Sequence, residues 1–133
     1  MSEIFKTFPK ELGVMKDLTK AEEQIMQIVW EHDKMFIKDI VDQMPDPKPA
    51  YNTVGTFLKI LETKGFVNRE KVGNTFSYSA TVKKKAYTKK SMNGLLSNYF
   101  EGSAEKLFSF MMQEKKLSPE QVEDLMQKLE DHE

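Results

Sequence analysis

Apolar residues recur at the spacing of an α-helix in the N-terminal half of the chain and predict three short helices. The first begins after Thr19, whose hydroxyl can form a capping box with the carboxylate of Glu22. We expect the apolar stripe of this helix to face the core and Glu22 to face the solvent. Two further helices are predicted over residues 35–44 and 51–64, because three prolines between positions 45 and 49 must end the earlier one.

Two runs suited to β-strands follow the third helix. Residues 66–72 and 75–80 flank Gly73-Asn74, a dipeptide typical of a two-residue hairpin turn. A hairpin directly after a third helix indicates a winged helix-turn-helix. The predicted fold class is therefore mainly α with a small β-hairpin wing, in a domain spanning residues 18–81. Residues 1–17 lack a clean period and are interpreted as an N-terminal extension.

Residues 82–133 are predicted to form three more helices. Gly102 separates the first two, and Ser103 and Ser118 are suitable N-caps for the second and third. A helical domain of this size cannot bury its apolar side chains alone, and we therefore favour a homodimer interface. The alternative is that these helices fold back on the N-terminal domain. The expected dimerisation residues are Leu95, Leu96, Tyr99, Phe100, Leu107, Phe108, Met111, Val122, Leu125 and Leu129.

Composition excludes several classes of function. The 133 residues are 39% hydrophobic and 31% charged, and no apolar run is long enough to span a membrane, so we expect a soluble, cytoplasmic protein. The chain has no cysteine, and its two histidines, His32 and His132, are far apart in the sequence. We therefore expect no disulfide, no metal site, no cofactor and no enzymatic activity.

The net charge of −1 conceals an uneven distribution. Residues 48–90 carry 10 Lys/Arg against 2 Asp/Glu, a charge of +8, whereas residues 1–47 carry −4 and residues 91–133 carry −5. A basic segment between two acidic ones favours an anionic partner such as the phosphates of DNA, although a solvated lysine-rich surface is the alternative.

The third predicted helix carries residue types that can read DNA bases. Asparagine pairs with adenine through two hydrogen bonds, and the threonine methyl group can contact the thymine methyl group. Gly55 within this helix indicates either a close backbone approach or a harmless surface position. Basic residues on the helix and the wing would contact phosphates. The expected DNA-binding residues are Tyr51, Asn52, Thr53, Thr56, Lys59, Lys64, Arg69, Lys71 and Asn74.

Several stretches resemble the penicillinase repressor family, the BlaI/MecI/CopY type of bacterial transcription regulator. The similar stretches are residues 18–31, 51–57, 61–67 and 100–103. This resemblance implies a repressor with an N-terminal winged helix and a C-terminal three-helix dimerisation domain, bound as a homodimer to a palindromic DNA operator. The alternative is a winged-helix module that binds another protein and recognises no DNA sequence.

The resemblance also implies a means of inactivation. In the β-lactam branch of the family, a membrane sensor protease triggers cleavage within the dimerisation domain, usually between Asn and Phe. Ser109 and Phe110 align with that position and form the candidate cleavage site. Many relatives have lysines where this chain has Asn52 and Gly55, so the operator sequence does not carry over. The copper branch uses cysteine pairs, and a copper switch of that kind is not expected here.

Overall fold

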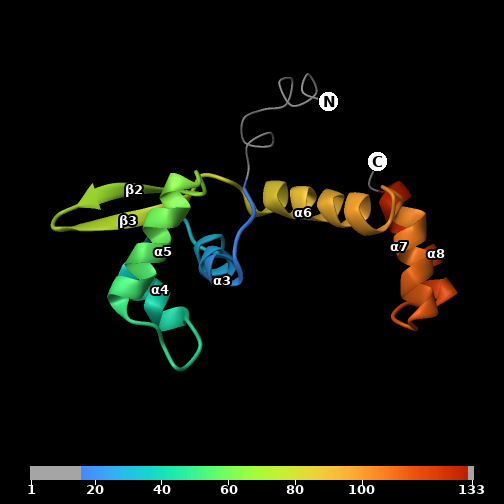
Figure 1. Ribbon diagram of the computed structural model, residues 1–133, viewed down its shortest axis with the longest axis horizontal. Coiled ribbons are helices and arrows are strands. Elements are labelled where there is room, and N and C mark those ends of the chain that lie inside the picture. Colours follow the sequence, from blue (N-terminus) through green and yellow to red (C-terminus); the bar gives the residue numbers. More distant parts are fainter. Residues whose placement is uncertain (1–15, 132–133) are drawn as a thin grey trace, which may run out of the picture. The chain divides into compact units, whose positions relative to one another are not determined.

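The computed structural model describes residues 16–131 as two compact units, the first ending at Thr88 and the second beginning at Lys89 (Figure 1). Except for Lys16 and Asp17, the N-terminal extension expected over residues 1–17 lies outside the described residues. None of the described helices is long and apolar enough to cross a membrane.

Helices and a small sheet alternate in the first unit. Its elements are α3 (Lys20–Val29), β1 (Met35–Phe36), α4 (Ile37–Gln43), α5 (Tyr51–Thr63), β2 (Val67–Val72) and β3 (Thr75–Ala80). The next helix, α6 (Lys84–Tyr99), begins in this unit and continues into the second. The second unit also contains α7 (Ala104–Gln113) and α8 (Pro119–Asp131). The predicted fold class, mainly α with a winged helix-turn-helix, is confirmed.

The capping box at the start of α3 is confirmed. The Glu22 backbone N–H donates to the Thr19 hydroxyl at 3.2 Å, and the Glu22 carboxylate accepts from the Thr19 backbone N–H at 3.0 Å. The expectation that Glu22 faces the solvent is wrong, because this residue is only 3% exposed. Helical periodicity assigns a charged residue to the outer face, but Lys64, distant in sequence, covers this one.

The second predicted helix starts two residues too early. Met35 and Phe36 form strand β1 and pair antiparallel with Tyr78 and Ser77 of β3, so the helix α4 begins only at Ile37. Pairing with β3 gives the backbone groups of these two residues hydrogen-bond partners. In the first turn of a helix, the backbone N–H groups would have no such partner within the helix. The sheet has the order β1-β3-β2.

The predicted hairpin is confirmed. Strands β2 and β3 pair in antiparallel register from Val67 opposite Ala80 to Val72 opposite Thr75. Gly73 opens the turn at φ +61°, in the left-handed region that glycine enters without steric cost. In Figure 1 the hairpin projects from the helices of the first unit, as a wing does.

The core of the first unit extends into the first turn of α6. Tyr87 is buried, with its ring centre 5.5 Å from that of Phe66 and 5.9 Å from that of Trp30. The Trp30 indole N–H also donates to the Val82 carbonyl oxygen at 2.8 Å. These contacts explain why the compact unit runs past residue 81 to Thr88.

The helices α7 and α8 of the second unit are well capped, but their described residues form no buried core. The Ser103 hydroxyl caps α7, and Ser118 and Gln121 form both halves of a capping box at α8, as predicted. Phe100 packs edge-to-face on Phe110, with ring centres 5.6 Å apart. Among the residues described from Lys89 onward, none is buried.

Candidate nucleic-acid interface

Helix α5 presents one face to the core and the opposite face to the solvent. Val54, Leu58 and Leu61 are almost fully buried, with 1% exposure or less, at the helical spacing of a single stripe. The residues expected to read DNA lie away from this stripe: Tyr51, Asn52, Thr53, Thr56 and Lys59 are all exposed. The buried stripe therefore fixes which side of α5 a partner can reach.

The polar groups at the N-terminal end of α5 are available to a ligand. Among the described residues, the side chains of Asn52 and Thr53 have no hydrogen-bond partner. The Thr56 hydroxyl instead donates to the Asn52 carbonyl oxygen at 3.0 Å, so it offers a methyl group and an acceptor rather than a donor. An amide with free donors and acceptor, next to threonine methyl groups, matches the edge of an A·T pair in the major groove.

Gly55 lies beside the core rather than on the exposed face. It is half-buried, and a Cβ atom at this position would lie 3.5 Å from Cδ1 of Ile37 in α4. The small residue therefore belongs to the crossing of α4 and α5 within the helix-turn-helix. Gly55 is therefore not one of the exposed residues of the candidate interface.

The expected DNA-binding residues of the wing differ in whether their side chains already make contacts within the protein. Lys71 and Asn74 are exposed and have no partner within the described part of the chain. Arg69 is already engaged, because its Nε lies 3.3 Å from the Glu62 carboxylate and its guanidinium lies 4.4 Å from the centre of the Phe76 ring. The Arg69 side chain is still 48% exposed, so some of its donors can reach a partner.

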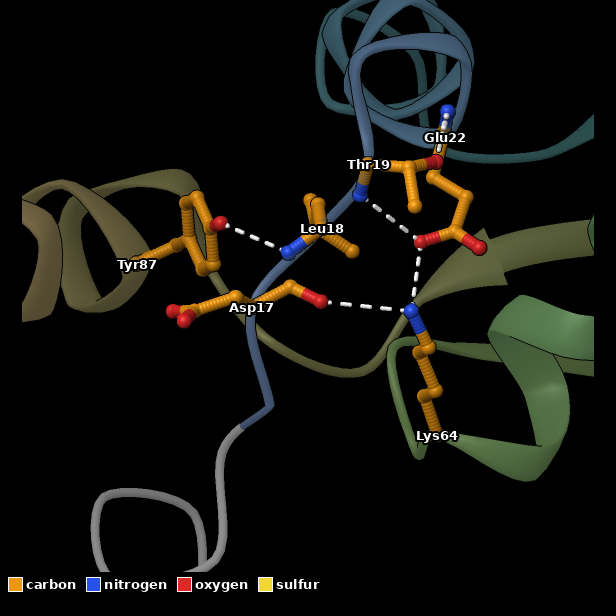
Figure 2. A network of polar contacts seen from close by, with 6 residues as sticks. All are labelled: Asp17, Leu18, Thr19, Glu22, Lys64 and Tyr87. Carbon is orange, nitrogen blue, oxygen red and sulfur yellow. Dashed lines mark hydrogen bonds and ion pairs between the residues drawn. The ribbon is translucent and has the colours of Figure 1, made fainter.

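Lys64 has a different environment from the other expected DNA-binding residues. Its ammonium group lies 2.6 Å from the Glu22 carboxylate and donates to the Asp17 carbonyl oxygen at 3.2 Å. Both contacts are drawn as dashed lines in Figure 2. Its side chain is 20% exposed and that of Glu22 is 4% exposed. The structure thus places Lys64 in an internal ion pair that links the end of α5 to the start of α3.

Glu22 is the residue of this network that sequence reasoning missed. Burial would raise the pKa of its carboxyl group, but the hydrogen bonds from Lys64 and Thr19, with the charge of Lys64, outweigh burial and hold the pKa below its ordinary value. The capping-box spacing connected Glu22 to Thr19 alone. No local signal could connect it to a lysine 42 positions later.

A further hydrogen bond attaches α6 to this network. The Leu18 backbone N–H donates to the Tyr87 hydroxyl at 2.9 Å (Figure 2). The residues just before α3 are therefore held by the end of α5 on one side and by the first turn of α6 on the other. Lys64 and Tyr87 act here as structural residues of the first unit.

The expected dimerisation residues lie on α6 to α8 or next to them and keep much of their apolar surface accessible. Leu95, Tyr99 and Leu125 are exposed, with Tyr99 at 75%. The partly buried members are Leu96, Phe100, Leu107, Phe108, Met111 and Val122. Leu129 belongs to α8, but its side chain is outside the described part of the structure. The candidate cleavage residues Ser109 and Phe110 are exposed in the middle of α7.

The amino-acid sequence is similar to those of known repressors. A family model described as penicillinase repressor matches residues 18–131. The penicillinase repressor of Bacillus licheniformis is 23% identical over 116 residues, which are 86% of this chain and 91% of that protein. The methicillin resistance regulatory protein MecI of Staphylococcus aureus strain N315 is 23% identical over 110 residues, covering 82% of this chain and 89% of that one.

A solved structure with a TM-score above 0.5 shares the fold. The complex structure of hsRosR-S4 matches with a TM-score of 0.52 at 16% identity and covers 79% of this chain and 93% of its own. The solution structure of the DNA binding domain of the repressor BlaI gives a TM-score of 0.49 at 23% identity and covers 55% of this chain and 90% of its own.

Proposed function

Because the chain belongs to the penicillinase repressor family, we propose that it is a transcriptional repressor that binds double-stranded operator DNA as a homodimer. The observation that carries the proposal is the exposed face of α5, where Asn52 and Thr53 have no partner among the described residues. The protein acts by occupying a promoter in the cytoplasm, where bacterial DNA lies, and catalyses no reaction.

The proposed complex places α5 in the major groove. There Asn52 and Thr53 read base edges, while the methyl group of Thr56 contacts thymine. Tyr51 and Lys59 flank these residues and contact the sugar-phosphate backbone. The wing residues Arg69, Lys71 and Asn74 contact the backbone on one side of the groove.

Charge supports the proposal once internal ion pairs are taken into account. Lys64 forms an ion pair with Glu22 inside the protein. Arg69 forms an ion pair with Glu62 at the surface. Lys59 and Lys71 are exposed, and neither has an ion-pair partner within the described residues. These two lysines are therefore the stronger sources of phosphate binding, and the affinity should fall as salt rises. Lys64 makes no phosphate contact in the proposed complex, because it pairs with Glu22.

The proposed dimerisation is supported by the second unit, whose described residues are all at least partly exposed. Helices α6 to α8 expose Leu95, Tyr99 and Leu125, which a second copy of the chain would cover. A two-fold dimer presents two α5 helices to successive major grooves about 34 Å apart, so the operator is expected to be palindromic. Tethering two modules raises the apparent affinity by orders of magnitude over one.

The test of DNA reading compares two variants on two duplexes. An operator is first obtained by selecting bound sequences from random duplex DNA. Thr53→Ala should weaken binding to the selected duplex more than binding to a scrambled one, because it removes a base contact. Lys71→Ala should weaken both equally, because phosphates carry no sequence information. Equal losses on both duplexes for Thr53→Ala would contradict base reading by α5.

The test of dimerisation uses light scattering after size exclusion at micromolar concentration. The wild-type chain should elute with the mass of two chains, and Leu125→Lys should shift it toward one, because a charge would then have to be buried in the interface. A wild-type chain that is monomeric at this concentration would remove the tethering argument. Salt-independent binding, or none, to every duplex would favour a protein-binding module instead.

We also propose that cleavage between Ser109 and Phe110 inactivates the repressor, downstream of a membrane sensor protease. Both residues are exposed on α7, but a protease binds its substrate as an extended segment, so this helix must open first. Mass spectrometry of the protein from bacterial cells treated with a β-lactam should then show fragments that end at Ser109. Induction of the repressed genes while the chain stays intact would exclude this mechanism.

A further inference from the structure

The outer face of α5 contains a cleft toward its C-terminal end. This cleft has a volume of about 430 Å³, and one of its walls comes from the residue that precedes α3 by four positions. Its lining residues are Lys16, Thr56, Lys59, Ile60, Thr63 and Lys64. Thr56 also belongs to the face proposed to read bases, so the cleft is continuous with that face.

The position of Lys16 is set by its neighbours in the chain. The Asp17 carbonyl oxygen accepts from Lys64 at 3.2 Å, and the Leu18 N–H donates to the Tyr87 hydroxyl at 2.9 Å (Figure 2). Leu18 is partly buried against the core. The backbone is thus held immediately after Lys16. These contacts of Asp17 and Leu18 place Lys16 beside α5, although the Lys16 side chain itself makes no hydrogen bond or ion pair within the described residues.

The positive charge of the cleft comes from Lys16 and Lys59. Both side chains are exposed, and within the described residues neither ammonium group has an ion-pair or hydrogen-bond partner. Lys64 is different, because Glu22 offsets its charge at 2.6 Å. No carboxylate lines the described walls of the cleft. Two lysines without an ion-pair partner among the described residues therefore line the same cleft.

The hydroxyl groups in the cleft narrow the class of ligand. Thr56 donates to the Asn52 carbonyl oxygen and Thr63 donates to the Lys59 carbonyl oxygen, each at 3.0 Å. The free donors are then the two ammonium groups, which act as point charges with hydrogens and suit a phosphate oxygen. Base edges, which offer donors as well as acceptors, fit this arrangement less well.

We propose that Lys16 and Lys59 together bind one backbone phosphate of the same DNA duplex that α5 reads. This inference rests on the proposed function and adds a contact outside the family match, which begins at residue 18. The segment that precedes α3 thus acts as a second attachment to the DNA backbone, distinct from the wing.

The experiment measures duplex binding by fluorescence anisotropy with the full chain at several salt concentrations. Lys16→Ala should weaken binding about fivefold at 0.15 M salt, and equally on the selected operator and a scrambled duplex. Lys16→Ala with Lys59→Ala should reduce the salt dependence by about one phosphate, a slope change of about 0.9 in log K against log salt. The control, Lys116→Ala, removes an exposed lysine from the segment between α7 and α8 and should change neither quantity.

The outcomes separate this inference from the proposed function. If Lys16→Ala binds like Lys116→Ala while the wild-type chain keeps its salt-dependent binding, the cleft is not a phosphate site and only this inference fails. A slope change of about 1.8 in the double variant would also overturn it, because the two lysines would then contact separate phosphates. If the wild-type chain binds no duplex, the repressor function fails as well.

Discussion

Replacing Lys64 with methionine should destabilise the first unit by about 2–4 kcal/mol. The substitution keeps most of the side chain's length but removes the ammonium group that faces Glu22 at 2.6 Å and the Asp17 carbonyl oxygen at 3.2 Å. A hydrogen bond to a charged group contributes about 1.5–3 kcal/mol, and one to a carbonyl oxygen about 1 kcal/mol. Glu22, with its side chain 4% exposed, is left as a nearly buried carboxylate without its counter-ion.

The assay is urea unfolding followed by fluorescence of the single tryptophan. Trp30 reports on the first unit because its indole donates to the Val82 carbonyl oxygen and its ring packs near Tyr87. The matched control is Lys59→Met on the same helix, whose lysine is exposed and has no ion pair among the described residues, so its effect should stay within about 0.5 kcal/mol.

A double-mutant cycle isolates the pair itself. Glu22→Gln removes the charge but keeps a residue that can complete the capping box with Thr19. If the ion pair operates as the structure shows, the double variant Glu22→Gln with Lys64→Met should be more stable than the sum of the single losses implies, by about 1–3 kcal/mol. Additive losses, with a coupling free energy under about 0.5 kcal/mol, would refute the reasoning.

The same pair predicts a pH dependence with a definite sign. The folded pKa of Glu22 lies below the ordinary value of 4.5, so its contribution to stability is complete above about pH 4.5 and is lost as the pH falls through the folded pKa. In Lys64→Met, burial without the counter-ion should raise this pKa instead, because the charged form is then disfavoured. The stability difference between wild type and variant should therefore begin to shrink as the pH falls through the variant's raised pKa, above 4.5, and should be smallest below the folded pKa of the wild type.

Three further predictions use the same unfolding assay. Gly55→Ala should stabilise the first unit by about 0.5–1 kcal/mol, because alanine favours the helix and its Cβ meets Ile37 at an ordinary 3.5 Å; destabilisation would mean that α4 and α5 pack too closely for a methyl group. Tyr87→Phe should cost about 1 kcal/mol, since the Leu18 N–H loses its acceptor, and no loss would indicate that water replaces it. Gly73→Ala should cost about 1 kcal/mol from its φ of +61°, and unchanged stability would imply that the turn rearranges.

Much of the fold was predictable because its signals are local. The capping boxes at Thr19 and Ser118 join residues three positions apart, and the hairpin turn at Gly73-Asn74 depends on two adjacent residues. The exposed face of α5 follows from a helical period alone. Such features require no knowledge of what lies elsewhere in the chain.

The errors and omissions share one cause. Strand β1 has two residues, too few to show a period, and exists because it pairs with β3 more than forty positions later. The orientation of Gly55 toward α4 depends on how two helices cross. These features are set by contacts between distant segments, and the chain's local pattern does not record them.

The features of the candidate interface are likewise of two kinds, those set by the local sequence and those set by contacts between distant segments. The sequence by itself determined which helix carries Asn52 and Thr53, where the wing turns and which third of the chain is basic, because these depend on residue type and spacing. Only the tertiary structure decided that Lys64 faces Glu22, whereas Lys16 and Lys59 share a cleft. The physical reason is that the charge a lysine offers to a partner depends on which carboxylate folding brings within a few ångströms of it, and that distance exists only in the folded chain.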